Sequence, residues 1–298
     1  MKDYSENRKA HLCKYAQDNN LPVGGKWKDK SYNHILIKKI ENNKCNIERT
    51  LFDNLIKEIK EINNPFGFLD KLHIYARHLN SSQMLCYNYF RPMLSDNKKA
   101  KDELVNLISE KITPITNDAE CQFEYNPDKN ERTEFDFYIK QDACKEIFFE
   151  IKYTENGFGK AKNDKEHKEK FESTYKSMIA DCVCLKDKTN IQSRNFFNDY
   201  QLFRNVIRVT DKNKFSIFIF PKENKNIKSS FENFKKRYIS EEYSDNVKVL
   251  YWEDLMEGKE ETELFKKYFD CTPTEFRKLS KTEHRDKLSP FGLSLTHI

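Results

Sequence analysis

Three short segments rich in aromatic and β-branched residues follow one another closely in the middle of the chain. They read "ECQFEY" at 120–125, "TEFDFYI" at 133–139 and "EIFFEIKY" at 146–153, and polar stretches such as "NPDKNE" separate them. Short runs of this composition between polar turns are typical of β-strands joined by tight connections. They predict a three-stranded meander, and the rest of the chain has to fold around it.

Helical and strand patterns alternate on either side of this meander. Apolar residues recur at helical spacing in 95–111 and 195–209. The segments 214–220 and 247–251 have the composition of strands, and a basic helix is expected at 222–238 between them. The order helix, three strands, helix and strand predicts an α/β fold.

The chain of 298 residues is long enough for one large domain or two ordinary ones, at about 150 residues per domain. We expect one core with additions. The core is predicted at 95–251, with a helical insertion at about 160–190. An N-terminal helical segment, 1–94, which includes a clear helical pattern at 48–62, is expected to pack on the core, and 252–298 is expected to form a C-terminal helical extension.

The bulk composition narrows the function classes only slightly. With 53 basic and 48 acidic side chains the net charge is +5, which allows a polyanionic partner without requiring one. No stretch approaches the ~20 apolar residues of a membrane span, and the first residues lack an apolar segment of the signal-peptide type, so a cytoplasmic protein is expected. The eight cysteines include no C-x-x-C pair and are expected to be reduced thiols.

The meander carries charged residues at positions that apolar residues would otherwise fill. Side chains alternate between the two faces of a strand, so Glu150 and Lys152 share one face. By the same rule Asp136 lies opposite the apolar face that Phe135 and Phe137 are expected to form. If these strands pair as an antiparallel hairpin, Asp136 and Glu150 meet, with Lys152 beside them.

This combination has a specific chemistry. Two carboxylates and the backbone carbonyl of Ile151 supply the hard oxygen ligands that Mg²⁺ prefers, and Lys152 adds a positive charge. Such a site can hold a scissile phosphate, lower the pKa of a metal-bound water and neutralise charge in the transition state. The alternative is a surface ion pair of Glu150 and Lys152 on a solvated face, which explains poorly why Phe148 shares that face.

Glu150-Ile151-Lys152, fourteen positions after Asp136, resembles the D…ExK core of the PD-(D/E)XK nuclease superfamily. The order of the elements is similar to the αβββαβ core of that superfamily. The segments "SSQMLCYNYFRPML", "QFEYNP", "FEIKYTENGFG" and "YQLFRN" resemble a branch of type II restriction endonucleases, over most of 70–220. The resemblance implies a restriction-endonuclease-like fold with a mixed central β-sheet flanked by helices. Phe135 stands where many members have Pro, which removes no ligand.

The resemblance also implies residues outside the D…ExK motif. In some relatives a glutamine on the equivalent later helix contacts the site, so Gln201 is expected to orient Lys152 or a water molecule. Many members add a glutamate from the first core helix to the metal site. Glu103 and Glu110 both flank the apolar stripe of that helix, with Glu103 preferred as the further ligand, although either is also an ordinary surface acid.

Each of several other polar residues has two possible roles. Glu134 is an outer ligand or the solvent end of its strand, and His167 is a general base or simply exposed. Arg204 and Arg208 are solvated surface residues or phosphate contacts. Gln83, a polar residue in an apolar segment, needs a hydrogen-bond partner and is either a structural latch or a residue that positions DNA.

The function that these observations favour is a Mg²⁺-dependent DNA endonuclease of restriction or phage defence, with Mn²⁺ as a substitute cation. Asp136 and Glu150 hold the metal, Lys152 activates water, and the products carry 5′-phosphates, as the family resemblance implies. The expected partners are double-stranded DNA, a cognate DNA methyltransferase and a second copy of the chain, since one site cuts one strand. The alternatives are a repair or recombination nuclease and a non-catalytic nuclease-like protein that only binds DNA.

Overall fold

A computed structural model describes residues 4–38, 46–47, 75–128, 131 and 133–270 of the chain. The helix expected at 48–62 and the end of the expected C-terminal extension, 271–298, lie outside the described residues.

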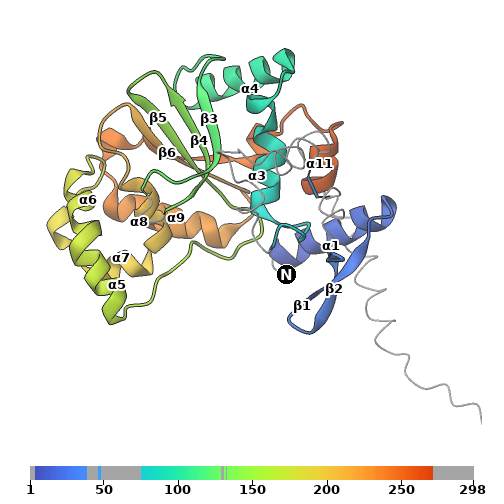
Figure 1. The fold of residues 1–298 in the computed structure, drawn as a ribbon, viewed down its shortest axis with the longest axis horizontal. Helices are drawn as coiled ribbons and strands as arrows, with labels where there is room; N and C mark the ends of the chain where they lie inside the picture. Colours follow the sequence, from blue (N-terminus) through green and yellow to red (C-terminus); the bar gives the residue numbers. More distant parts are fainter. Residues whose placement is uncertain (1–3, 39–45, 48–74, 129–130, 132, 271–298) are drawn as a thin grey trace, which may run out of the picture.

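The centre of the structure is a mixed five-stranded sheet in the order β3-β4-β5-β6-β7 (Figure 1). The strands are β3 (Glu120–Tyr125), β4 (Phe135–Gln141), β5 (Lys145–Ile151), β6 (Lys214–Phe220) and β7 (Val247–Tyr251). The first three pair antiparallel and form the predicted meander, whereas β5, β6 and β7 run parallel. The expected α/β fold with a mixed sheet is therefore confirmed.

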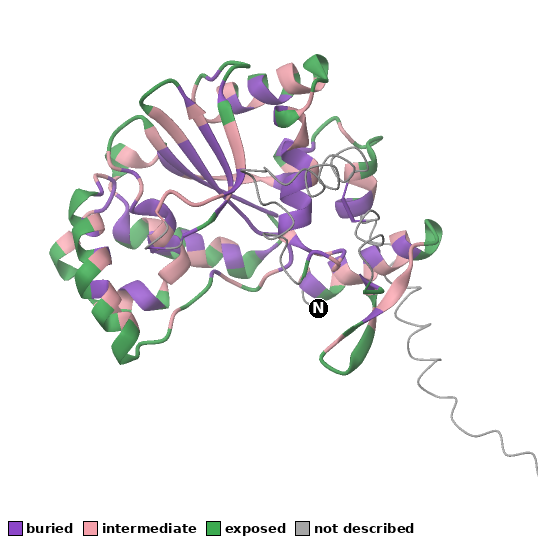
Figure 2. Ribbon diagram, viewed as in Figure 1, coloured by how far each residue is buried: buried purple, intermediate pink, exposed green. Residues whose placement is uncertain are grey.

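Helices cover both faces of the sheet, and most of the sheet is buried between them (Figure 2). On one face lie α3 (Ser82–Phe90), the 3₁₀ turn η2 (Arg91–Leu94) and α4 (Lys98–Lys111). The ring of Phe90 stacks on that of Phe137 with centroids 4.2 Å apart. The other face is covered by α8 (Tyr200–Val206) and α9 (Lys225–Tyr238), where Phe218 and Phe231 have ring centroids 5.0 Å apart.

Two of the helices that the sequence predicts are divided into shorter helices in the structure. The single helix expected at 195–209 is two helices, α7 (Ser193–Asn198) and α8, which meet at Asp199 with a non-helical φ of −116° and ψ of 35°. The insertion after β5 consists of α5 (Lys165–Lys170), the π-helical turn η3 (Phe171–Tyr175) and α6 (Lys176–Asp181). The break at Asp199 sets the direction of α8 independently of α7.

The N-terminal segment is not wholly helical as expected. After α1 (Tyr4–Asp18) the chain forms an antiparallel hairpin of β1 (Val23–Trp27) and β2 (Lys30–Leu36). A glycine pair permits the register shift within β1: Gly24 has a φ of +96°, and a Cβ at Gly25 would collide with the carbonyl oxygen of Leu36. The sequence has no long alternating pattern here, so the hairpin was not predicted.

The C-terminal part of the described chain returns to the N-terminal segment. It contains α10 (Trp252–Leu255) and α11 (Glu263–Tyr268), and α1 packs on α11. His11 on α1 forms a hydrogen bond through Nε2 with the carbonyl of Lys267, at 2.9 Å. Of the helices in the described part of the chain, none combines the length and the apolar character needed to cross a membrane.

Phe137→Ala tests the aromatic packing between α3 and the sheet. Phe137 is fully buried and packs on Phe90, so its truncation leaves a cavity and lowers the free energy of unfolding by about 3–5 kcal/mol. Urea unfolding followed by circular dichroism measures this change. Leu94→Ala is the control, because Leu94 is 51% exposed and its loss changes stability by less than about 0.5 kcal/mol. Equal stability of the two variants contradicts this packing.

Candidate active site

The candidate site lies where β4 and β5 stop pairing. The last residues paired at this end are Phe137 and Phe149, so Asp136 and Glu150 occupy the next positions outward. There the side chain of Asp136 replaces a backbone partner: its Oδ2 accepts the N–H of Ile151 at 2.6 Å. This hydrogen bond places the Asp136 carboxylate beside the Glu150–Ile151 peptide, as the sequence analysis expected.

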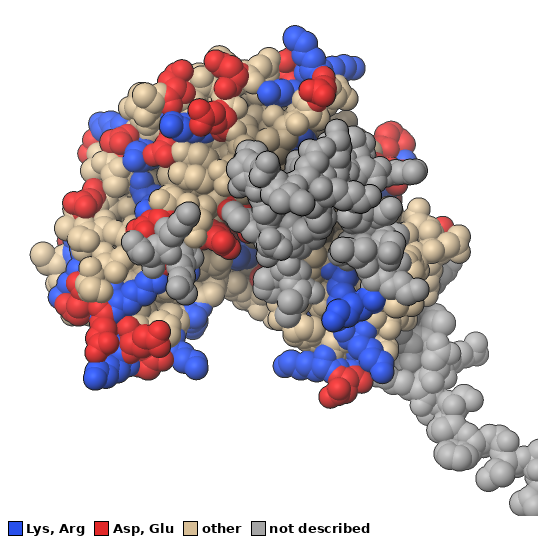
Figure 3. All heavy atoms as spheres, in the orientation of Figure 1, with Lys and Arg blue, Asp and Glu red and all other residues tan. Residues whose placement is uncertain are grey.

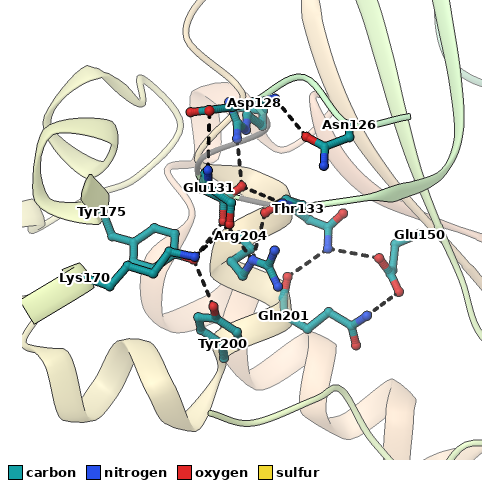
Figure 4. A network of polar contacts seen from close by, with 12 residues as sticks. Asn126, Asp128, Glu131, Thr133, Glu150, Lys170, Tyr175, Tyr200, Gln201 and Arg204 are labelled. Carbon is teal, nitrogen blue, oxygen red and sulfur yellow. Dashed lines mark hydrogen bonds and ion pairs between the residues drawn. The ribbon is translucent and has the colours of Figure 1, made fainter. Parts of the chain in front are cut away.

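The carboxylate of Glu150 is buried and receives three side-chain donors. Lys152 Nζ and Gln201 Nε2 both donate to Oε1, at 2.5 and 2.6 Å, and Asn205 Nδ2 donates to Oε2 at 3.1 Å. Gln201 and Asn205 come from α8, and Figure 4 shows Gln201 pointing toward Glu150. Only 4% of Glu150 is exposed, so the ion pair with Lys152 is not the solvated surface pair of the alternative reading.

The backbone of Lys152 is fixed from two sides. Its N–H donates to the carbonyl of Ile219 at 2.8 Å, and its carbonyl accepts the indole N–H of Trp252 at 3.1 Å. Burial opposes the charged form of Lys152, but the carboxylates of Glu150, Glu155 and Asp136 outweigh burial and raise its pKa. Lys152 is therefore a fixed, protonated ammonium group.

A third acid, Glu124 on β3, belongs to this group and was not predicted. Phe123, Phe137 and Phe149 lie side by side on β3, β4 and β5, because Phe137 pairs with both of the others. Glu124, Asp136 and Glu150 are each one residue further along their strand in the same direction across the sheet, so they are also neighbours. Glu124 has a positive φ of 48°, which breaks the alternation of β3.

Helix α3 holds this third carboxylate. Gln83 Nε2 donates to Glu124 Oε1 at 2.8 Å, and the hydroxyl of Tyr87 donates to the same atom at 3.1 Å. Gln83 thus has the hydrogen-bond partner that its apolar setting requires. The glutamine in "SSQMLC" was the only sequence signal for the pair, since nothing in "ECQFEY" distinguishes Glu124 from Gln122.

The charges of this group are unbalanced. Burial raises the pKa of Asp136 well above its usual range, and Glu150 raises it further. Lys152 lowers it, but Glu124 adds a second nearby negative charge. Among the described residues, Lys152 is the ammonium group that pairs with Glu150, and Asp136 and Glu124 lie beside that pair. An additional positive charge would therefore stabilise the group.

The other sequence-predicted acids lie elsewhere. Glu103 is on the exposed side of α4, where Lys259 is its charged neighbour. Glu110 is also exposed and pairs with Lys111 at 2.8 Å. Glu134 is exposed next to the start of β4. The first core helix thus brings no acid to Asp136; the third acid comes from β3.

His167 also lies apart from Asp136 and Glu150. It forms a hydrogen bond through Nδ1 with Asp164 at the start of α5, at 2.6 Å.

Arg204 and Arg208 are partly exposed, and both bind an acid of the protein, so they are more than simply solvated surface residues. Their guanidinium groups each bind the carboxylate of Glu131, both at 2.9 Å, and Glu131 is fully buried in the loop between β3 and β4 (Figure 4). Glu131 also accepts the hydroxyl of Tyr175 at 2.8 Å and the N–H of Thr133 at 2.9 Å. Five groups therefore meet in one buried cluster, which we call the Glu131 cluster.

The Glu131 cluster connects the loop before β4 to the helix that binds Glu150. Arg204 donates from α8 both to Glu131 and, at 2.8 Å, to Thr133 Oγ1. Gln201 lies one turn earlier on α8 and Asn205 one residue later, and both contact Glu150. The cluster thereby sets how α8 presents its two amides to β5.

A mixed sheet flanked by helices, with buried acids and a lysine at the end of two central strands, is consistent with a restriction-endonuclease-like protein. The family described as "Restriction Endonuclease associating with ARP" matches residues 8–270, and the chain belongs to this family. Comparisons with curated proteins and with solved structures give no match. Membership of this family supports a nuclease role in restriction.

Glu131→Gln tests the Glu131 cluster. The change leaves two largely covered arginines without their buried charge partner, so the free energy of unfolding at pH 7 falls by about 3 kcal/mol. Chemical denaturation of both proteins measures the difference. Glu172→Gln is the matched control, because Glu172 forms an exposed pair with Lys176 whose loss changes stability by less than about 0.5 kcal/mol.

The effect of Glu131→Gln also depends on pH. Burial opposes the charged form of Glu131, but Arg204 and its other partners outweigh burial and lower its pKa below the ordinary value of 4.5. A lowered carboxyl pKa stabilises the fold above 4.5, and this contribution is lost as the pH falls through the folded-state pKa. The stability difference between wild type and variant therefore shrinks below pH 4.5. A difference that is constant from pH 7 to pH 3 contradicts a charged Glu131.

Proposed function

We propose that the chain is a metal-dependent DNA endonuclease of the PD-(D/E)XK type, with Asp136, Glu150 and Lys152 as its catalytic residues. The observation that carries the proposal is the hydrogen bond of Asp136 to the N–H of Ile151, which joins this acid to the buried Glu150–Lys152 pair. Membership of a restriction endonuclease family supports the nuclease chemistry.

The residues fit a divalent cation by their chemistry. Within the described residues, no three His, Cys, Asp or Glu side chains are grouped so that they could hold a metal ion. The proposed site therefore uses two side chains, Asp136 and Glu150, together with the backbone carbonyl of Ile151. Asp136 Oδ1 accepts no hydrogen bond from the described part of the chain and is available. Burial raises the pKa of Asp136, and the neighbouring charge of Glu150 raises it further. Mg²⁺, or Mn²⁺ in its place, would neutralise the negative charge of these two carboxylates.

A bound Mg²⁺ would supply Lewis-acid activation of water and charge neutralisation at the phosphate. Lys152 contributes a protonated ammonium at the edge of the same group, where it stabilises negative charge that develops on the phosphate oxygens. Its fixed backbone keeps this charge in place during the reaction.

Gln201 and Asn205 act on the reaction through Glu150. Their amide groups hold the two oxygens of that carboxylate, so they orient the ligand rather than contact the substrate. Gln201 is itself held because its Oε1 accepts the N–H of Gly159 at 3.0 Å. Glu103, expected as a further ligand, is left out because it lies on the exposed side of α4.

The proposed substrate is double-stranded DNA, and the proposed role is restriction of foreign DNA in phage defence. A cognate methyltransferase that protects the host DNA is part of this role. Cleavage of both strands of a duplex by one site per chain favours a homodimer with twofold symmetry. The products carry 5′-phosphates, as in the nuclease superfamily that the motif resembles.

Lys152→Ala tests the proposal. Purified protein incubated with unmethylated phage DNA and closed circular plasmid produces bands in the presence of Mg²⁺ and none with EDTA. The variant loses at least about 100-fold in rate, because the protonated group beside the phosphate is gone. Lys145→Ala is the matched control, since Lys145 lies at the other end of β5, where its ammonium donates to the carbonyl of Pro114.

Equal cleavage by wild type and Lys152→Ala contradicts the proposed site. Cleavage of closed circular DNA supports an endonuclease, whereas a strict requirement for free ends supports a repair or recombination nuclease that uses the same residues. DNA binding without any metal-dependent cleavage supports a protein that only binds DNA.

A further inference from the structure

The molecule is hollowed between two projecting arms (Figure 3). One arm is the β1–β2 hairpin, and the other is the helical insertion that begins with α5 (Figure 1). Lysine and arginine side chains gather at the end of the hairpin arm in Figure 3, and basic and acidic side chains are mixed on the insertion. The hollow lies on the side where the chain continues from Lys152 toward α5.

The hairpin carries positive charge that no acid in the described part of the chain pairs with. Lys26, Lys28 and Lys30 are exposed, and none of the three forms an ion pair within the described residues. Arg77 lies against the hairpin, where its guanidinium donates to the carbonyl of Lys26. Asp29 is the single acid between Lys26 and Lys30. An anionic partner would complete this surface.

The hairpin is joined closely to the candidate active site. Its second strand binds 77–79: Leu36 N–H donates to the carbonyl of Arg77 at 3.0 Å, and the carbonyl of His34 accepts the N–H of Leu79 at 2.9 Å. The side chain of Asn80 then donates to Thr154 Oγ1 at 2.8 Å, two residues after Lys152. The position of the hairpin is therefore fixed relative to the end of β5.

The loop after Lys152 supplies positive charge on the opposite side. Lys160 and Lys162 are exposed and form no ion pair among the described residues. Gly159, directly before Lys160, forms two hydrogen bonds with Gln201. Its N–H donates to the side-chain Oε1 of Gln201 at 3.0 Å, and its carbonyl accepts the backbone N–H of Gln201 at 3.1 Å. The same glutamine contacts Glu150, so this basic loop is also fixed to the site.

We propose that the β1–β2 hairpin is a DNA-binding arm, whose Lys26, Lys28 and Lys30 contact the phosphate backbone of a duplex seated in the hollow. Lys160 and Lys162 contact the duplex from the other side, and the Asp136–Glu150–Lys152 group lies between. Two fixed basic surfaces on either side of a hydrolytic group suit a double-stranded polyanion better than a small phosphate ester. This inference rests on the proposed function and adds the surface that holds the substrate.

The test compares two triple variants that change the net charge equally. Lys26→Gln/Lys28→Gln/Lys30→Gln removes the charge of the hairpin arm, and Lys98→Gln/Lys99→Gln/Lys101→Gln removes three charges from α4, which lies far from the hollow in Figure 1. Binding of a labelled 30-base-pair duplex is followed by fluorescence anisotropy in EDTA over a range of salt concentrations. Unchanged thermal unfolding of each variant confirms that it is folded.

The hairpin variant is expected to bind the duplex about tenfold or more weakly, and the slope of log K against log salt falls by about 3, since each lost phosphate contact removes ~0.9. The α4 variant keeps the wild-type slope. Equal slopes for wild type and the hairpin variant overturn the inference.

These outcomes are separate from those of the proposed function. Binding in EDTA requires no catalysis. If the wild type never cleaves DNA, the nuclease proposal is contradicted, but the contribution of the hairpin arm to duplex binding can still be measured.

Discussion

The hydrogen bond between the Asp136 carboxylate and the N–H of Ile151 is the contact on which the rest of the site depends. At this point β4 and β5 no longer pair through their backbones, and a buried N–H without a partner would destabilise the fold. The carboxylate fills that place. In doing so it is held next to Glu150 and brings a second negative charge into a buried setting, which raises its pKa.

Each face of the sheet contributes polar groups to this end. From one face, Gln83 and Tyr87 of α3 hold Glu124 beside Asp136. From the other, Gln201 and Asn205 of α8 hold Glu150. The Glu131 cluster joins the loop before β4 to α8, so the start of β4 and this helix are linked directly. The site is therefore a product of the layered fold and is held by three elements besides the D…ExK strands.

The strands of the meander and the grouping of Asp136, Glu150 and Lys152 follow from the sequence, because alternation along a strand depends on local pattern alone. Glu124 does not, since its inclusion requires a positive φ that no local pattern in β3 indicates. Arg204 has the appearance of a surface residue on α8 until Glu131, distant in sequence, binds it. Glu103 has the right position along its helix, but α4 turns it toward solvent. Contacts between residues distant in sequence thus decide which polar side chains reach the site, and local periodicity does not show these contacts.

The central claim is that the buried acids around Asp136 bind one divalent cation. Isothermal titration with Mn²⁺ tests it most directly, with wild type compared with Asp136→Asn and with Asp142→Asn, an exposed residue of the turn between β4 and β5. The account predicts one Mn²⁺ per chain in wild type and in Asp142→Asn, and none in Asp136→Asn. Binding of equal affinity in all three proteins, or no binding to wild type, would contradict it.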